Sequence, residues 1–201
     1  MLSIATNVTS WDSQIIRHTL PNWLRVFGSR VQELLVLVDT TPLTGRIREV
    51  RVSETLAPPV TDVVGELKCL AAREVRIRFG SIDPLAPEAM ASANHWFAGT
   101  RPWRCQAGTP ILPFCVGIDK ARSPHVLHAD CDMLFSNCEW LDRCQELLDS
   151  GAAHLVEPPR LTAALPGNRC DMSTRAFFLK PATFSEDCLP MRATNRFYKR
   201  G

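Results

Sequence analysis

The chain has 201 residues, 45% of them apolar, which is enough to bury one hydrophobic core and fits the usual size of a single domain. Its 23 basic and 21 acidic side chains leave a net charge of +2, so no large field would draw the whole molecule onto nucleic acid or an anionic membrane. We therefore expect one domain over residues 1–201, with local binding sites and no nucleic-acid partner.

The apolar segments are too short or too interrupted for export or membrane insertion. Asp12, Arg17 and Arg25 break up the first 30 residues, where a secretory signal needs an uninterrupted apolar stretch. The longest aliphatic run elsewhere, residues 34–38, is far shorter than the roughly 20 residues that span a bilayer. The sequence predicts a cytoplasmic protein, soluble or peripheral to a membrane, with no transmembrane segment.

Eight cysteines raise the alternatives of a disulfide framework and a zinc site. No two of them form a CxxC pair, which is the usual spacing in zinc sites and redox motifs. The favoured interpretation is thiols packed as small apolar groups.

The first 80 residues alternate between strand and helix patterns. Residues 3–6 predict a short strand and residues 7–13 a loop, followed by a helix whose apolar positions recur at helical spacing. The unbroken run 34–38 is typical of a strand buried inside a parallel sheet. Thr61 or Asp62 then caps a second helix, and residues 75–79 alternate between apolar residues and arginines like a strand.

The second half continues this alternation after an irregular stretch, residues 84–113, which we expect to be partly helical. Residues 126–129 predict a fourth strand. Ser136 and Glu139 match a capping box for the next helix, and Gly151 suits its C-terminal cap. Strands are also predicted at 154–156 and 176–179. The pattern indicates an α/β fold with a mostly parallel central sheet and helices on both faces.

Two carboxylates follow the fourth predicted strand, in the segment Asp130-Cys131-Asp132. Side chains two apart on an extended segment point to the same side, so Asp130 and Asp132 can face one ion. Hard cations such as Mg²⁺ and Mn²⁺ prefer such oxygen ligands and share them with water and substrate phosphates. The alternative is that the pair solvates a strand end or caps the next helix. His128 shares the face of Asp130, and a core histidine is favoured there over a ligand.

Three segments, SIATNVTSWD, LLVLVDTTP and VLHADCDMLF, resemble the family 2 glycosyltransferases of GT-A fold, in order and spacing over roughly residues 3–180. The resemblance implies a single GT-A (Rossmann-like) domain of the nucleotide-diphospho-sugar transferase superfamily. It implies that Thr6 and Asn7 lie near the base and that Asp39 accepts a hydrogen bond from the nucleoside. The alternatives are that Asp39 starts a turn and that Asn7 is an Asx-turn residue. Asp130 and Asp132 would hold the donor ribose and a Mn²⁺ or Mg²⁺ ion on its diphosphate.

The reaction implied is transfer of a hexose from a nucleotide-diphospho-sugar donor to a hydroxyl of a glycan, lipid-linked or small-molecule acceptor. An inverting reaction needs a carboxylate base, and Glu186-Asp187 resembles the family's acidic pair, which makes Asp187 the candidate. The alternative is that Asp187 is a surface acid. Met133 departs from the family, which has an acidic residue there, and the chain is short after this pair.

Two other functions remain open. A non-catalytic or degenerate nucleotide-sugar-binding protein would fit the short C-terminus. A nucleotidyltransferase also uses an α/β sheet with a metal, but loop 7–13 contains neither the glycine nor the lysine of a phosphate-binding loop. The sequence therefore favours a glycosyltransferase.

Overall fold

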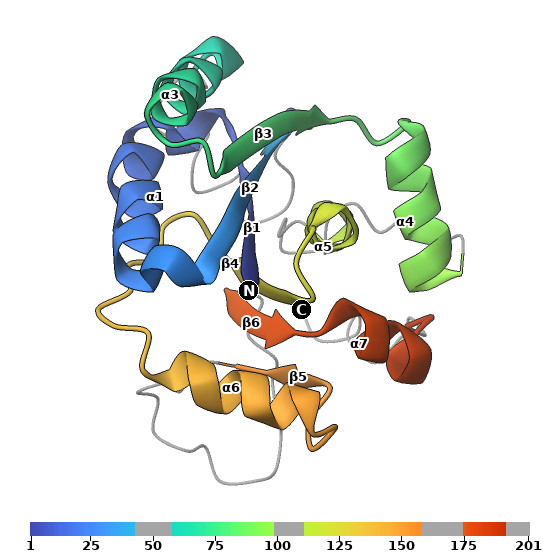
Figure 1. The fold of residues 1–201 in the computed structure, drawn as a ribbon. Coiled ribbons are helices and arrows are strands. Elements are labelled where there is room, and N and C mark those ends of the chain that lie inside the picture. Colours follow the sequence, from blue (N-terminus) through green and yellow to red (C-terminus); the bar gives the residue numbers. More distant parts are fainter. Residues whose placement is uncertain (43–57, 99–110, 158–174, 192–201) are drawn as a thin grey trace, which may run out of the picture.

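The computed structural model describes residues 1–42, 58–98, 111–157 and 175–191. Six strands form one sheet in the order β3-β2-β1-β4-β6-β5 (Figure 1). Strands β3, β2, β1 and β4 pair in parallel, whereas β6 is antiparallel to both of its neighbours. Of the six strands in the described ranges, β6 alone is therefore reversed, which confirms the mostly parallel α/β sheet. The strands are β1 (Leu2–Val8), β2 (Val31–Asp39), β3 (Ile77–Ile82), β4 (His125–Ala129), β5 (Leu155–Val156) and β6 (Ala176–Leu179).

Helices cover both faces of the sheet, as predicted. Apolar residues of α1, α3 and α6 pack on one face, and those of α4, α5 and α7 pack on the other. Figure 1 shows α1 and α3 on one side of the strands and α4 and α5 on the opposite side. The bounds are α1 (Ser13–Phe27), α3 (Val60–Arg73), α4 (Pro87–Phe97), α5 (Leu112–Lys120), α6 (Trp140–Asp149) and α7 (Pro181–Cys188), with short 3₁₀ helices η1 (Ser10–Asp12) and η2 (Gly28–Arg30).

The central strands owe their position to their composition. Strand β2 is buried from Glu33 through Asp39, and residues Leu34, Val36 and Val38 face the opposite cluster from Leu35 and Leu37. A strand that is apolar on both faces is stable only between two layers. Within the described ranges, the helices lack the length and apolarity that a membrane crossing requires.

Several predicted boundaries were wrong. Helix α3 starts at Val60 after an extended Pro59, ahead of the predicted cap, and α6 starts at Trp140, so Ser136 forms no capping box. Val75 is 91% exposed and precedes β3. The sequence analysis did not predict α5, whose nine residues are buried through most of their length and show little helical periodicity. Local patterns lose information where an element is buried on all sides.

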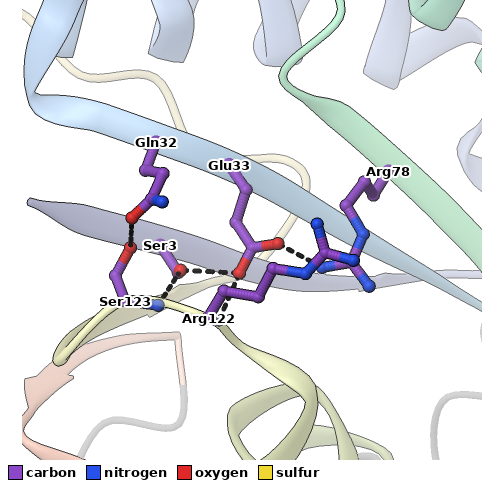
Figure 2. Close-up of polar contacts among 6 residues, drawn as sticks. All are labelled: Ser3, Gln32, Glu33, Arg78, Arg122 and Ser123. Atoms are coloured by element: carbon purple, nitrogen blue, oxygen red, sulfur yellow. Dashed lines mark hydrogen bonds and ion pairs between the residues drawn. The ribbon is translucent and has the colours of Figure 1, made fainter.

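A buried carboxylate joins the amino ends of four strands (Figure 2). Glu33 is 3% exposed; its Oε1 accepts hydrogen bonds from Ser3 Oγ, at 2.8 Å, and from the backbone N–H of Arg122. Its Oε2 pairs with the guanidinium of Arg78. Ser3 Oγ in turn accepts from the Ser123 N–H at 3.0 Å. The contacts link β1, β2, β3 and the segment that enters β4.

We expect Glu33→Ala to lower the free energy of unfolding by about 3 kcal/mol, because it leaves a guanidinium and buried donors without their acceptor. Urea denaturation followed by circular dichroism measures this loss. The matched control is Glu146→Ala, which removes an exposed pair with Arg143 and should cost less than about 1 kcal/mol. Similar losses in the two variants would contradict the role of Glu33.

Candidate functional site

The parallel pairing brings three predicted site residues to one edge of the sheet. Val8 lies opposite Val38 in the register of β1 and β2, and Ala5 lies opposite His128 in that of β1 and β4. Asn7, Asp39 and Asp130 each lie within two residues of one of these positions, at the carboxyl end of their strands. Ligands of open α/β sheets bind beyond this edge.

Asp39 lies at the wall of a pocket of about 340 Å³ at the ends of β1 and β2. Its side chain is buried, and its Oδ1 accepts from the N–H of Thr41 at 2.9 Å and from Thr41 Oγ1 at 2.5 Å. This Asx turn is the structural role that the sequence left open, and it fixes the carboxylate at the pocket wall. The pocket is lined by Thr9, Ser10, Trp11, Asp39, Thr40, Thr41, Pro42, Pro58, Pro59 and Val60.

The other wall is shaped by a local cap. Thr9 and Asp12 form a capping box at η1, in which Asp12 Oδ2 accepts from the N–H of Thr9 at 2.7 Å. The cap holds Trp11 at the pocket. The sequence analysis did not single out Trp11, Pro58 or Pro59, since residues so far apart in the chain give no common signal.

Thr6 and Asn7, predicted to act together, point to opposite faces of β1. Asn7 alternates onto the face of Ala5, whereas Thr6 lies with Ile4 and Val8 on the face that α1 and α3 cover. Among the residues that the structure describes, neither the Asn7 amide nor the Thr6 hydroxyl has a hydrogen-bond partner, and these atoms are buried. A buried amide without partners is costly, so the Asn7 side chain is suited to a polar ligand.

Asp130 and Asp132 face a common point, and Arg175 occupies it. Arg175 Nε lies 3.4 Å from Asp130 Oδ2, and its Nη2 donates to Asp132 Oδ1 at 2.5 Å. The Asp130 N–H donates to the Arg175 carbonyl at 2.7 Å, which places the start of β6 beside the end of β4. The hydrogen bond to Asp132 raises the pKa of the Arg175 guanidinium. The sequence analysis missed Arg175, because only the reversed β6 brings it here.

The carboxylate pair fits a Mg²⁺ or Mn²⁺ ion that keeps some ligands from water and phosphate. Its oxygens reach one guanidinium, so they are able to converge on one cation. No third His, Cys, Asp or Glu joins them among the residues that the structure describes. Mg²⁺ commonly uses one or two carboxylates together with substrate phosphates. A cation would compete with Arg175 for both oxygens.

His128 is part of the core, in agreement with the favoured interpretation. It is 1% exposed, and its ring centroid lies 4.1 Å from that of Phe114 and 4.9 Å from that of Phe177. Its Nε2 is 3.8 Å from Asp130 Oδ1, which is beyond hydrogen-bond distance.

Asp187 lies at the opposite end of the sheet from this site. Its Oδ2 is 3.4 Å from His154 Nδ1, directly before β5, and Leu155 is level with Val126 at the start of β4. Four residues of strand, roughly 13 Å, separate that level from Asp130. The prediction that Asp187 is the base at the donor site does not agree with this placement. The physical reason is the reversal of β6, after which α7 begins at the amino edge.

No protein-family model and no curated protein matches the sequence. Solved structures do match the fold. The galactosyltransferase LgtC, in complex with donor and acceptor sugar analogues, superposes with a TM-score of 0.52 at 9% identity, covering 92% of this chain and 60% of that one. An active-site mutant of LgtC superposes with a TM-score of 0.51 at 10% identity, covering 92% of this chain and 59% of the mutant's chain. TarS of S. aureus superposes with a TM-score of 0.45 at 11% identity, covering 92% of this chain and 49% of the TarS chain.

The chain thus spans about three fifths of the length of the LgtC chains. The likeness, at this level of identity, concerns the fold. Together with the strand order and the helices on both faces, it shows a GT-A-like fold, as the sequence predicted.

We expect Arg175→Ala to raise the affinity for Mn²⁺ about tenfold, because the cation no longer competes with two ion pairs. Calorimetric titration of the nucleotide-free protein measures the change. Asp132→Asn should abolish the binding. The control is Arg143→Ala, which alters an exposed arginine on α6 and should leave the affinity unchanged. Equal Mn²⁺ affinity with and without Arg175 would contradict a cation site at this pair.

Proposed function

We propose that residues 1–201 act as one domain that transfers a sugar from a nucleotide-diphospho-sugar to an acceptor hydroxyl. The observation that carries the proposal is the alignment of Asn7, Asp39 and Asp130 along the carboxyl edge of a GT-A-like sheet. The solved LgtC structure, which shares this fold, was obtained with donor and acceptor sugar analogues. A donor and an acceptor are therefore the ligands we assign to this edge.

The nucleoside would enter the pocket beside Asp39. A carboxylate accepts hydrogen bonds from ribose hydroxyls or from base N–H groups, and the neighbouring Trp11 and prolines supply apolar surface for a planar base. The Asn7 amide offers one acceptor and two donors. Binding would satisfy its buried atoms, which gives the ligand an advantage over water.

The diphosphate would lie toward Asp130 and Asp132. These carboxylates would hold Mn²⁺ or Mg²⁺, which when bound acts as a Lewis acid for the leaving diphosphate. Arg175, displaced from the two carboxylates, would remain near enough to pair with a phosphate oxygen, a geometry that guanidinium groups favour. We assign no catalytic base at the carboxyl edge, since Asp187 lies at the amino edge. Without an assigned base, we assign neither inversion nor retention of configuration to the transfer.

The second candidate is a nucleotide-sugar-binding protein without transferase activity. Two observations favour it: the ion pairs of Arg175 with both carboxylates, and the distance of Asp187 from them. The two functions differ in turnover. Labelled uridine, guanosine and thymidine diphosphate sugars, incubated with Mn²⁺ and no acceptor, should be slowly hydrolysed by a transferase. Binding without turnover across the panel would establish the second candidate.

We expect Asp39→Asn to weaken binding of the preferred nucleoside diphosphate at least tenfold, because a hydrogen bond to a charged group contributes about 1.5–3 kcal/mol. The asparagine keeps an acceptor for Thr41, so the turn should persist. A thermal-shift titration with and without Mn²⁺ measures the affinity.

The matched control is Asp83→Asn. Asp83 follows β3 and accepts from the Leu85 N–H at 2.8 Å in the same kind of turn, but it does not line the pocket. The Asp83→Asn variant should bind the preferred nucleoside diphosphate with the affinity of the wild type. If Asp39→Asn and Asp83→Asn behave alike, the nucleoside does not bind at Asp39.

A further inference from the structure

A serine, a histidine and an aspartate line up at the junction of α4, α5 and α7, away from the donor site. Ser185 Oγ lies 2.6 Å from His95 Nε2, and His95 Nδ1 lies 3.3 Å from Asp119 Oδ1. This is the order of contacts in which a carboxylate orients an imidazole and the imidazole takes a hydroxyl proton. Such constellations are recognised by geometry rather than by sequence position.

The aspartate of this group is held in place from two sides. Trp96 Nε1 donates to Asp119 Oδ1 at 2.9 Å, and Ser92 Oγ donates to Oδ2 at 2.5 Å. Both donors belong to buried residues of α4. Trp96 also stacks on Phe184 of α7, with ring centroids 5.6 Å apart. The packing therefore fixes Asp119 relative to α4, and α4 relative to the helix that carries Ser185.

The group is accessible to a small electrophile. The His95 side chain is 44% exposed and that of Asp119 is 25% exposed, while Ser185 is half-buried. Helix α5 ends in the segment that enters β4, and α7 follows β6, so the group lies toward the amino edge of the sheet. The donor site occupies the carboxyl edge. A reaction at Ser185 would therefore be independent of sugar transfer.

We propose that Ser185 is an activated nucleophile that accepts an acyl group from an activated ester, with His95 as general base and Asp119 as positioning residue. Ser185 Oγ attacks the ester carbonyl while its proton passes to His95 Nε2. The alcohol leaves with that proton, and the acyl group stays on Ser185. Water then attacks the new ester with His95 again taking the proton, and the carboxylic acid leaves as Ser185 regains its hydrogen.

Deacylation should be slow. Backbone N–H groups inside a helix are bonded to the preceding turn, so Ser185 within α7 brings no free N–H pair to stabilise an oxyanion, a contribution that is worth a factor of about 100–1,000 in rate. Acylation lacks the same stabilisation, but an activated ester expels a far better leaving group than the serine alkoxide, so the acyl-protein should accumulate. A burst of alcohol equal to the protein concentration is the expected signature.

The test uses the full chain with a fluorophosphonate probe and, separately, with p-nitrophenyl acetate. Peptide mass spectrometry should find the phosphonyl or acetyl group on Ser185 of the folded protein. The urea-unfolded protein should label at least 100-fold more slowly, since a positioned base contributes a factor of about 100–10,000. Ser185→Ala should lose the label. Ser150→Ala is the control, because the Ser150 hydroxyl donates to the Leu147 carbonyl and contacts no histidine in the described part of the chain, so this variant should label like the wild type.

Two further variants separate chemistry from packing. His95→Ala should label at least 100-fold more slowly, and free imidazole in the buffer should restore part of the rate. Asp119→Asn should slow labelling, and Asp119→Glu should recover part of the loss. Thermal unfolding checks that each variant is folded. Labelling of Ser185 at the rate of the unfolded chain, or a folded His95→Ala that labels like the wild type, would overturn the proposal.

Discussion

The parallel pairing of β1 between β2 and β4 is the constraint on which the candidate site depends. Strands paired in parallel end at the same edge, so the polar residues that follow them meet there although they are far apart in the chain. The strands remain in this arrangement because each is buried between two helical layers. The buried carboxylate of Glu33 joins their amino ends and supports the same register.

The reversal of β6 has two consequences for function. It places Arg175 beside Asp130 and Asp132, where a guanidinium holds the two carboxylates together. It also directs α7 to the amino edge, which takes Asp187 away from these carboxylates. In the proposed function, a cation and its diphosphate would therefore enter a site that already contains the positive charge of Arg175. Donor binding and release of Arg175 would be coupled, because both use the same oxygens.

The two edges of the sheet thus carry different chemistry. At the carboxyl edge, the buried Asn7 amide has no hydrogen-bond partner among the described residues, and Asp39 places a carboxylate at the wall of a pocket, which suits recognition of a nucleoside. The opposite edge joins His95, Asp119 and Ser185 through side chains that are already within contact distance of one another. Binding at the carboxyl edge would give the Asn7 amide the partner that it lacks among the described residues, whereas the three side chains of the amino edge already contact one another.

The sequence by itself determined the α/β class, most of the strands and the D-x-D pair. Those features follow from local patterns: a run that is apolar on both faces, such as residues 34–38, predicts a buried strand whatever its neighbours are. The same local logic fails for α5, which is buried nearly all round and has little amphipathic period. The sequence pattern also predicted that α6 starts at Ser136, from an apparent capping box with Glu139. In the structure the chain continues as a loop from Ser136 and the helix begins at Trp140.

Only the tertiary structure decided which residues share a site. The direction of β6 places Asp187 far from Asp130 and brings Arg175 next to it. The alternation of side chains along β1 places Thr6 and Asn7 on opposite faces of the sheet. None of this is encoded locally, since pairing partners and strand direction are set by long-range burial. The sequence therefore names residues able to bind or react, and the fold determines which of them can do so together.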